Sequence, residues 1–182
     1  MFKLALSLAT VLVASLACAS TPIHVHDGLD YAIPKGSPVK FVSLAQYGVA
    51  NFQGRFVMSG SYHYGYITND PSRDATFGQL ELYFLPDTAI RKILPYWKER
   101  GAVREMRFKN EHDFVTTVIS TDDLTKLKEK KIFSVTGRAW IVVENYEASV
   151  ECDYPTYAVT FVSIERPQVS VASLTLVDQY GC

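Results

Sequence analysis

The stretch FQGRFVMSGSYHYGYI, residues 52–67, decides the fold class, because it has the composition of one long β-strand. Aromatic and β-branched residues favour strands, and Tyr62, Tyr64 and Tyr66 recur at the two-residue period that puts side chains on one face. Three glycines interrupt the run: Gly54, Gly60 and Gly65. Glycine inside a strand pattern marks a bulge or a sharp bend. The stretch therefore predicts a long, bent strand.

Shorter runs of the same composition predict more strands on both sides of this one, over residues 39–47, 78–86, 132–146, 156–165 and 169–177. Residues 103–110 and 113–120 flank the short polar sequence Asn110-Glu111-His112, which predicts a β-hairpin.

Two segments have helical patterns. Residues 86–101 begin with Asp87 as a predicted N-cap and stop at Gly101, and Pro95 must kink or split this helix. Residues 120–131 carry Ser120 or Thr121 as the N-cap and are predicted to form a short surface helix.

The chain shows no tandem repeat, and residues 39–182 are predicted to form one β-rich domain. A signal peptide is expected over residues 1–19, and residues 20–38 read as an extended segment with little regular structure. The order of the later elements is that of an OB-type, five-stranded barrel. We therefore expect a mainly β fold, either a single small OB-like barrel or a curved antiparallel sheet with one or two short helices. A sandwich is a further alternative, and fold alone identifies no function.

The N-terminus has the pattern of a secretory signal peptide. Lys3 precedes an uncharged apolar run over residues 4–16, and Ala17 and Ala19 occupy the small positions that signal peptidase needs. Cleavage is predicted after Ala19 or Ser20. The alternatives are a transmembrane anchor or a buried helix, but the apolar run is short for a bilayer.

Cys18 allows a different kind of processing. A cysteine that follows a short apolar and small-residue box can become the lipidated N-terminus of a bacterial lipoprotein. Ala17 suits that box, whereas Ser15 stands where leucine is expected. Lipidation of Cys18 would tether the protein to a membrane, and ordinary cleavage would release it.

Charge and cysteine content narrow the classes of partner. The whole chain has 18 basic and 19 acidic residues, and Lys3 is the one charge of the signal, which leaves the remaining chain at a net charge of −2. This balance argues against nucleic acid as a partner. Cys152 and Cys182 form an even pair in an exported chain, which predicts a disulfide. A thiol pair or metal pair is the alternative, and no CxxC spacing supports it.

The tyrosine-rich strand gives the predicted ligand-binding surface: Tyr62, Tyr64, Tyr66 and His63. Tyrosine combines apolar area with a polar tip, which suits carbohydrate and protein ligands. The alternative is that the rings only cover an outer face, with His63 and Ile67 pointing inward. Tyr146, Tyr154 and Tyr157 are further aromatic candidates near Cys152.

His24, His26 and Asp27 form a candidate metal site, because both histidines of an extended HxH lie on one side. The alternative is a solvated polar segment. Glu111, His112 and Asp113 form a second charged cluster, for which an ordinary turn is the alternative.

No GxSxG, SxxK or HExxH motif and no phosphate-binding glycine fingerprint occurs in the chain. We therefore predict no catalytic residue and no cofactor. The predicted function is an exported, disulfide-stabilised β-domain that acts as a binding or envelope-associated module, with a protein or carbohydrate ligand and no transmembrane segment in the mature chain. The alternatives are a hydrolase that uses His63, His112 or Asp113, and a metal-handling protein that uses the HxH.

Overall fold

The computed structural model describes residues 21–24, 30–66, 79–151, 154–166 and 170–173. Along the chain, the elements are β1 (Thr21–His24), β2 (Asp30–Ile33), β3 (Lys40–Leu44), the 3₁₀ helix η1 (Gln46–Gly48), β4 (Ala50–Gln53), β5 (Arg55–Tyr66), β6 (Leu80–Pro86), α1 (Thr88–Arg91), β7 (Tyr96–Trp97), the 3₁₀ helix η2 (Lys98–Arg100), β8 (Arg107–Phe108), α2 (Glu111–Val118), α3 (Thr121–Lys128), β9 (Ser134–Glu151), β10 (Tyr154–Arg166) and β11 (Ser170–Ser173). The fold is mainly β, as the sequence predicts.

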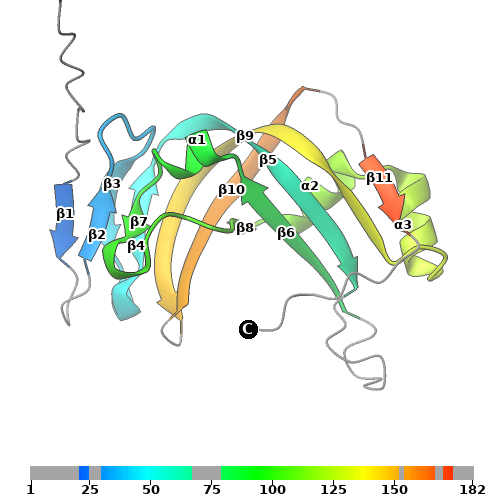
Figure 1. Ribbon diagram of the computed structural model, residues 1–182, viewed down its shortest axis with the longest axis horizontal. Coiled ribbons are helices and arrows are strands. Elements are labelled where there is room, and N and C mark those ends of the chain that lie inside the picture. The colour runs from blue at the N-terminus through cyan, green and yellow to red at the C-terminus, as the bar shows by residue number, and fades with distance from the viewer. Residues whose placement is uncertain (1–20, 25–29, 67–78, 152–153, 167–169, 174–182) are drawn as a thin grey trace, which may run out of the picture.

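The long strand β9 is the centre of the main sheet. β5 pairs with one edge of β9 from Arg55 opposite Glu144 to Gly65 opposite Ser134, and β10 pairs with its other edge. β6 continues the sheet beyond β5, and β4 and β3 continue it at the far end of β9. Figure 1 shows that these strands bend together into an arch.

The two outer strands of this sheet, β6 and β8, approach each other, but no continuous ladder of hydrogen bonds joins the described strands there. β8 runs parallel to β10, and one isolated antiparallel bridge joins Phe84 of β6 to Met106, just before β8. The Met106 N–H donates to the Phe84 carbonyl at 2.9 Å. The described strands therefore form open, curved sheets and no closed barrel, so the curved sheet is the observed architecture of the expected alternatives. The expected OB-like order of elements is wrong at its third strand, because residues 111–118 form the helix α2 and only Arg107 and Phe108 form a strand there.

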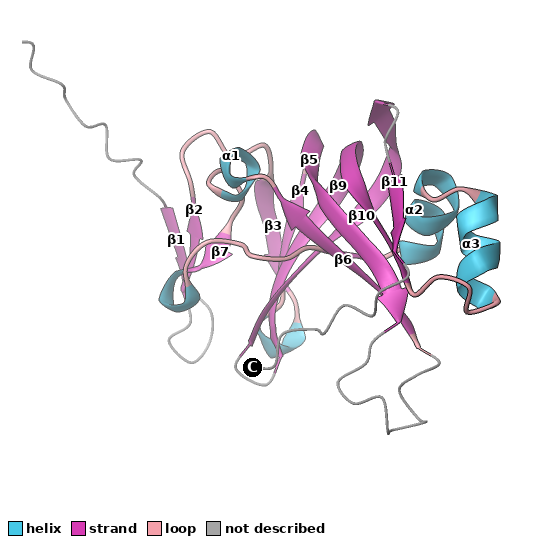
Figure 2. Ribbon diagram, turned by 45° about the vertical axis from the view of Figure 1, so that its right-hand side comes forward, coloured by secondary structure: helices cyan, strands magenta, loops and turns pink. Residues whose placement is uncertain are grey.

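A second, small sheet forms from β1, β2 and β7. It lies at one end of the arch, and α2 and α3 lie at the other (Figure 2). The expectation of little regular structure over residues 20–38 is wrong at β1 and β2, because these strands pair antiparallel with each other and β2 pairs with β7.

Three predictions of local structure need correction. The helix expected over residues 86–101 is a single turn, α1, because Pro95 cannot continue it, and β7 and η2 follow. The expected hairpin does not form: residues 111–118 are the helix α2, and only Arg107 and Phe108 form a strand. The predicted surface helix over residues 120–131 is confirmed as α3, whose N-cap Ser120 accepts the Asp123 N–H at 3.1 Å.

The core lies between the sheet and α2. Phe108 stacks on Phe114 with ring centroids 4.5 Å apart, and Phe84 and Phe161 meet these rings edge-on. Gly60 of β5 permits this packing, because a Cβ there would lie 2.6 Å from the Phe84 ring. β5 and β9 keep a regular register past Gly60, so this glycine allows close approach and forms no bulge. In the part of the chain that the structure describes, no helix is long and apolar enough to cross a membrane.

Candidate functional site

The strongest candidate site is a pocket of about 360 Å³ beside the first residues of β10. We call it the Tyr154 pocket, and its lining residues are Ala102, Arg104, Glu105, Tyr154, Pro155 and Tyr157. One wall comes from the irregular segment between η2 and β8, and the other comes from the start of β10. The pocket therefore combines two tyrosines with one acidic and one basic side chain, which is the mixture of apolar area and few polar groups typical of ligand sites.

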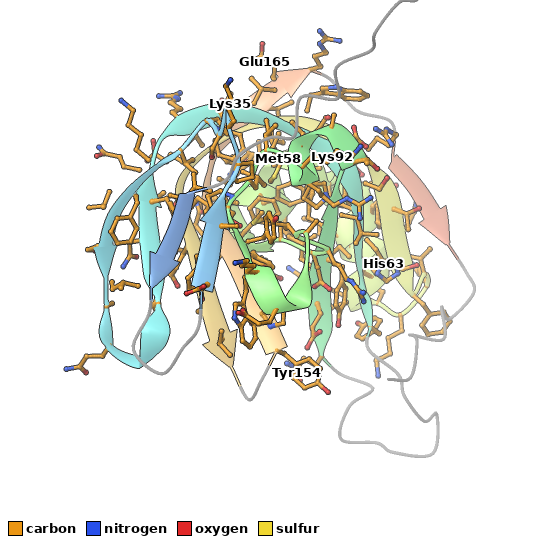
Figure 3. All side chains as sticks on the ribbon, turned by 60° about the vertical axis from the view of Figure 1, so that its left-hand side comes forward. Lys35, Met58, His63, Lys92, Tyr154 and Glu165 are labelled. Atoms are coloured by element: carbon orange, nitrogen blue, oxygen red, sulfur yellow. The ribbon has the colours of Figure 1, made fainter. Side chains whose placement is uncertain are left out.

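The two tyrosines of this pocket differ in exposure and in their contacts. Tyr154 is 66% exposed, and Figure 3 shows its side chain projecting from the end of the sheet. Tyr157 is buried, accepts the Trp97 N–H at 3.0 Å and stacks on Tyr146 with ring centroids 6.2 Å apart. Tyr157 is thus a fixed wall, and Tyr154 offers a free aromatic face at the rim.

Tyr146 fixes this wall from behind. It is fully buried, its hydroxyl donates to the Pro95 carbonyl oxygen, and burial raises its pKa well above the ordinary value. Tyr146 therefore stays neutral at physiological pH and supports the position of Tyr157.

Glu105 supplies the acidic group of the pocket. Burial raises the pKa of its carboxyl above the ordinary value; the nearby Arg107 guanidinium opposes this shift and the Glu81 carboxylate adds to it. A half-buried carboxylate with weak neutralisation favours contact with hydrogen-bond donors, such as the hydroxyl groups of a ligand.

A second, smaller pocket of about 330 Å³ lies between β6 and β8 and contains Glu81, Tyr83, Arg107 and Glu111. The Tyr83 hydroxyl donates to Glu81, and burial followed by repulsion from Glu81 raises the pKa of the Glu111 carboxyl. This pocket is acidic, but the described residues include no group of three or more potential metal ligands. Together with the Tyr154 pocket, it places polar side chains on both sides of the segment that leads through β8 to α2.

The structure places the predicted tyrosine surface in the core. Tyr62 is 2% exposed and packs edge-on against Phe114 at 5.7 Å, and Tyr66 is 7% exposed and donates its hydroxyl to the Leu127 carbonyl at 2.8 Å. Tyr64 is half-buried against the same core. The prediction of an exposed aromatic surface is therefore wrong for Tyr62 and Tyr66, because α2 and α3 cover that face of β5.

His63 lies on the other face of β5, opposite its tyrosine neighbours. Its ring centroid is 6.4 Å from that of Tyr83, and burial lowers its pKa. Its Nε2 is buried and has no hydrogen-bond partner among the described residues. The alternative arrangement, with tyrosines outside and His63 inside, is thus also wrong, since it is the tyrosines that face the core. Ile67 lies outside the described residues.

Glu111, His112 and Asp113 occupy the first turn of α2 and do not form a hairpin tip. His112 and Asp113 are exposed, and Asp113 accepts the Asn110 side-chain amide at 2.9 Å. His63 therefore belongs to a strand and His112 to the helix that covers its opposite face, so the structure does not assemble them into one site.

The remaining predicted sites lie wholly or mostly outside the described residues. These are the proposed metal ligands His26 and Asp27, the predicted disulfide Cys152–Cys182 and the lipidation candidate Cys18. His24 is the last residue of β1, and its backbone pairs with that of Asp30 in β2.

Sequence reasoning named Tyr154 and Tyr157 as further aromatic candidates but missed Arg104 and Glu105. These two residues lie about 50 positions from Tyr154 in the chain, and tertiary contacts such as the parallel pairing of β8 with β10 bring their segments together. No family model, curated protein or solved structure matches this chain.

Proposed function

We propose that this protein is an exported, non-catalytic carbohydrate-binding module and that its ligand occupies the Tyr154 pocket. The observation that carries the proposal is the exposed Tyr154 ring beside Glu105 and Arg104 in a pocket of about 360 Å³. The proposal also includes export through the N-terminal signal, with release from or tethering to the envelope decided by the fate of Cys18.

The chemistry of the lining residues favours a saccharide. A sugar ring has an apolar face of C–H groups that packs on an aromatic ring, and its edge carries hydroxyl groups. Glu105 can accept hydrogen bonds from these hydroxyls, and the Arg104 guanidinium can donate to their oxygen atoms. Tyr154 and Pro155 supply the apolar surface at the rim.

The charge of the chain favours a saccharide over a nucleic acid. The net charge of the full chain is −1, Glu105 lines the pocket, and the Glu81 carboxylate lies near enough to raise the pKa of both Glu105 and Glu111. A polyphosphate backbone needs a concentrated positive field, which these carboxylates would weaken.

Isothermal titration calorimetry with the tightest binder from a glycan array tests the proposal. Tyr154→Ala removes the exposed ring, whereas Tyr154→Phe keeps the ring and removes only its hydroxyl. Aromatic stacking on nucleobases contributes about 1–3 kcal/mol, which corresponds to roughly 5- to 150-fold in affinity. We expect a loss in this range for Tyr154→Ala and a change below about threefold for Tyr154→Phe.

Phe41→Ala is the matched control. Phe41 is also a partly exposed aromatic residue, but it lies on β3, at the other side of the sheet from β8. The proposal fails if Tyr154→Ala binds glycans as well as Phe41→Ala does, or if the array captures no glycan.

Export and the disulfide have their own test. The intact mass of the protein, purified without reduction from the cells that make it, is expected to begin at Ser20 or Thr21 and to be two hydrogens lighter than the dithiol form. A lipid-modified Cys18 at the N-terminus would replace release by membrane tethering.

A further inference from the structure

A third pocket adjoins the Tyr154 pocket, and its charged lining residues are all cationic. It has a volume of about 350 Å³ and lies between α1 and residues 101–104. We call it the Arg91 pocket, because its charged lining residues are Arg91, Lys92 and Arg104. Ala102 and Arg104 line both this pocket and the Tyr154 pocket, so the two are neighbours.

The cations of the Arg91 pocket are poorly neutralised. Among the described residues, no carboxylate forms an ion pair with Arg91, Lys92 or Arg104. The Asp87 carboxylate lies close enough to interact electrostatically with Arg91. Asp87, however, is already held by two contacts from Arg138 at 2.8 and 2.7 Å.

Arg91 has more donors than acceptors around it. Its guanidinium has five N–H groups, of which one nitrogen donates to the Thr88 hydroxyl at 3.0 Å. Its Nε is buried and has no hydrogen-bond partner among the described residues. A guanidinium with free donors next to a second guanidinium and an ammonium group is the arrangement that binds a carboxylate or sulfate.

We infer that the ligand is an acidic oligosaccharide: one sugar ring packs on Tyr154, and a carboxylate or sulfate group binds in the Arg91 pocket. This inference rests on the proposed function of the Tyr154 pocket. Figure 3 shows Tyr154 and Lys92 well apart on the molecule, so a ligand that reaches both is longer than one ring. Arg104, which both pockets share, would contact the middle of this ligand.

Binding of matched acidic and neutral saccharides tests the inference. The probes are oligosaccharides of uronic acids, each paired with its methyl ester, and sulfated oligosaccharides, each paired with its desulfated form. Calorimetry would compare the protein with the double variant Arg91→Gln/Lys92→Gln. The control Lys40→Gln/Arg55→Gln removes the same charge from exposed positions on β3 and β5.

We expect at least one acidic probe to bind at least tenfold more tightly than its neutral counterpart. Arg91→Gln/Lys92→Gln should remove this preference and leave binding of the neutral form within about twofold, whereas the control should keep the preference. The pair that shows the preference identifies the anion as carboxylate or sulfate. Circular dichroism melting curves of both double variants would confirm that they fold.

Other outcomes separate this inference from the proposed function. If acidic and neutral forms bind equally and Tyr154→Ala abolishes both, the saccharide function stands and the acidic ligand is overturned. If an acidic probe binds equally well to Tyr154→Ala, the two pockets do not share one ligand, and the inference is overturned. If no probe of either kind binds while the array yields another glycan, the acidic ligand is overturned and the saccharide function stands.

Discussion

Asn110 is the residue whose replacement tests the architecture beside the site most sharply. It follows β8 and precedes α2, and its side chain takes the place of a strand backbone next to β10. Its Nδ2 donates to the Phe161 carbonyl at 2.9 Å, and its Oδ1 accepts the Phe161 N–H at 2.8 Å. The same Nδ2 lies 2.9 Å from an Asp113 carboxylate oxygen, which ties the sheet to the first turn of α2.

Asn110→Ala would leave two backbone groups of a core residue without these partners. Phe161 is 5% exposed, so water replaces the lost bonds poorly. Each unsatisfied buried group costs about 1–3 kcal/mol. Asn110 itself is half-buried, so we take the lower part of this range and expect a loss of about 2–4 kcal/mol in the free energy of unfolding. For a chain of this length, that corresponds to roughly 5–15 °C in Tm.

Urea unfolding, followed by tyrosine and tryptophan fluorescence, measures this loss. Asn145→Gly is the matched control, because Asn145 has a positive φ of 54° that glycine adopts without strain, and among the described residues its side-chain amide donates to Glu144 alone, at 3.4 Å. We expect the control to change stability by less than about 0.5 kcal/mol or to raise it. A loss below about 0.5 kcal/mol for Asn110→Ala would refute the role of its side chain as a strand extension.

Three further predictions concern the sheet and the site. Gly60→Ala should destabilise the protein by about 1–3 kcal/mol in urea unfolding, because its Cβ would lie 2.4 Å from the Leu85 carbonyl oxygen; an unchanged midpoint would contradict the close approach. Tyr66→Phe should lower the free energy of unfolding by about 1 kcal/mol, since the Leu127 carbonyl loses the Tyr66 hydroxyl but keeps a backbone N–H donor. A loss above about 3 kcal/mol would contradict this. The raised pKa of Glu105 means that the folded protein loses stability as pH rises from the unfolded pKa through the folded one. Glu105→Gln should therefore raise Tm at pH 7 but not near pH 4. A rise in Tm at pH 4 alone would contradict a raised pKa of Glu105 in the folded protein.

The sequence predicted the sheet better than the segment between its strands. Most of the strand predicted over residues 52–67 is β5, with Phe52 and Gln53 in β4. The strands that became β6, β9 and β10 and the helix α3 were also predicted, because period-two patterns and the Ser120 cap are local signals. α2 was predicted as a strand because Val115, Val118 and Ile119 are β-branched. Its start does carry local helix signals, with Asn110 at the N-cap and Glu111 and Asp113 in the first turn, whereas the bond from Asn110 to Phe161, 51 residues away, has no local pattern.

The site was less predictable than the fold. The alternation of Tyr62, Tyr64 and Tyr66 correctly places them on one face, but it cannot tell which face α2 and α3 will cover. The Tyr154 pocket depends on the meeting of two distant segments, and Arg104 and Glu105 follow no motif that would identify them. Periodicity thus indicates which side chains lie together, and tertiary packing decides which of them stay exposed.

A two-dimensional amide NMR titration with the tightest glycan from the array would show directly whether the ligand occupies the Tyr154 pocket. We expect chemical-shift changes to concentrate in the segments 102–105 and 154–157, which contain the residues that line the Tyr154 pocket. An acidic ligand should extend these changes to Arg91 and Lys92. Changes confined to β3, or to the outer face around His63 and Tyr83, would contradict the account and move the binding site to another surface.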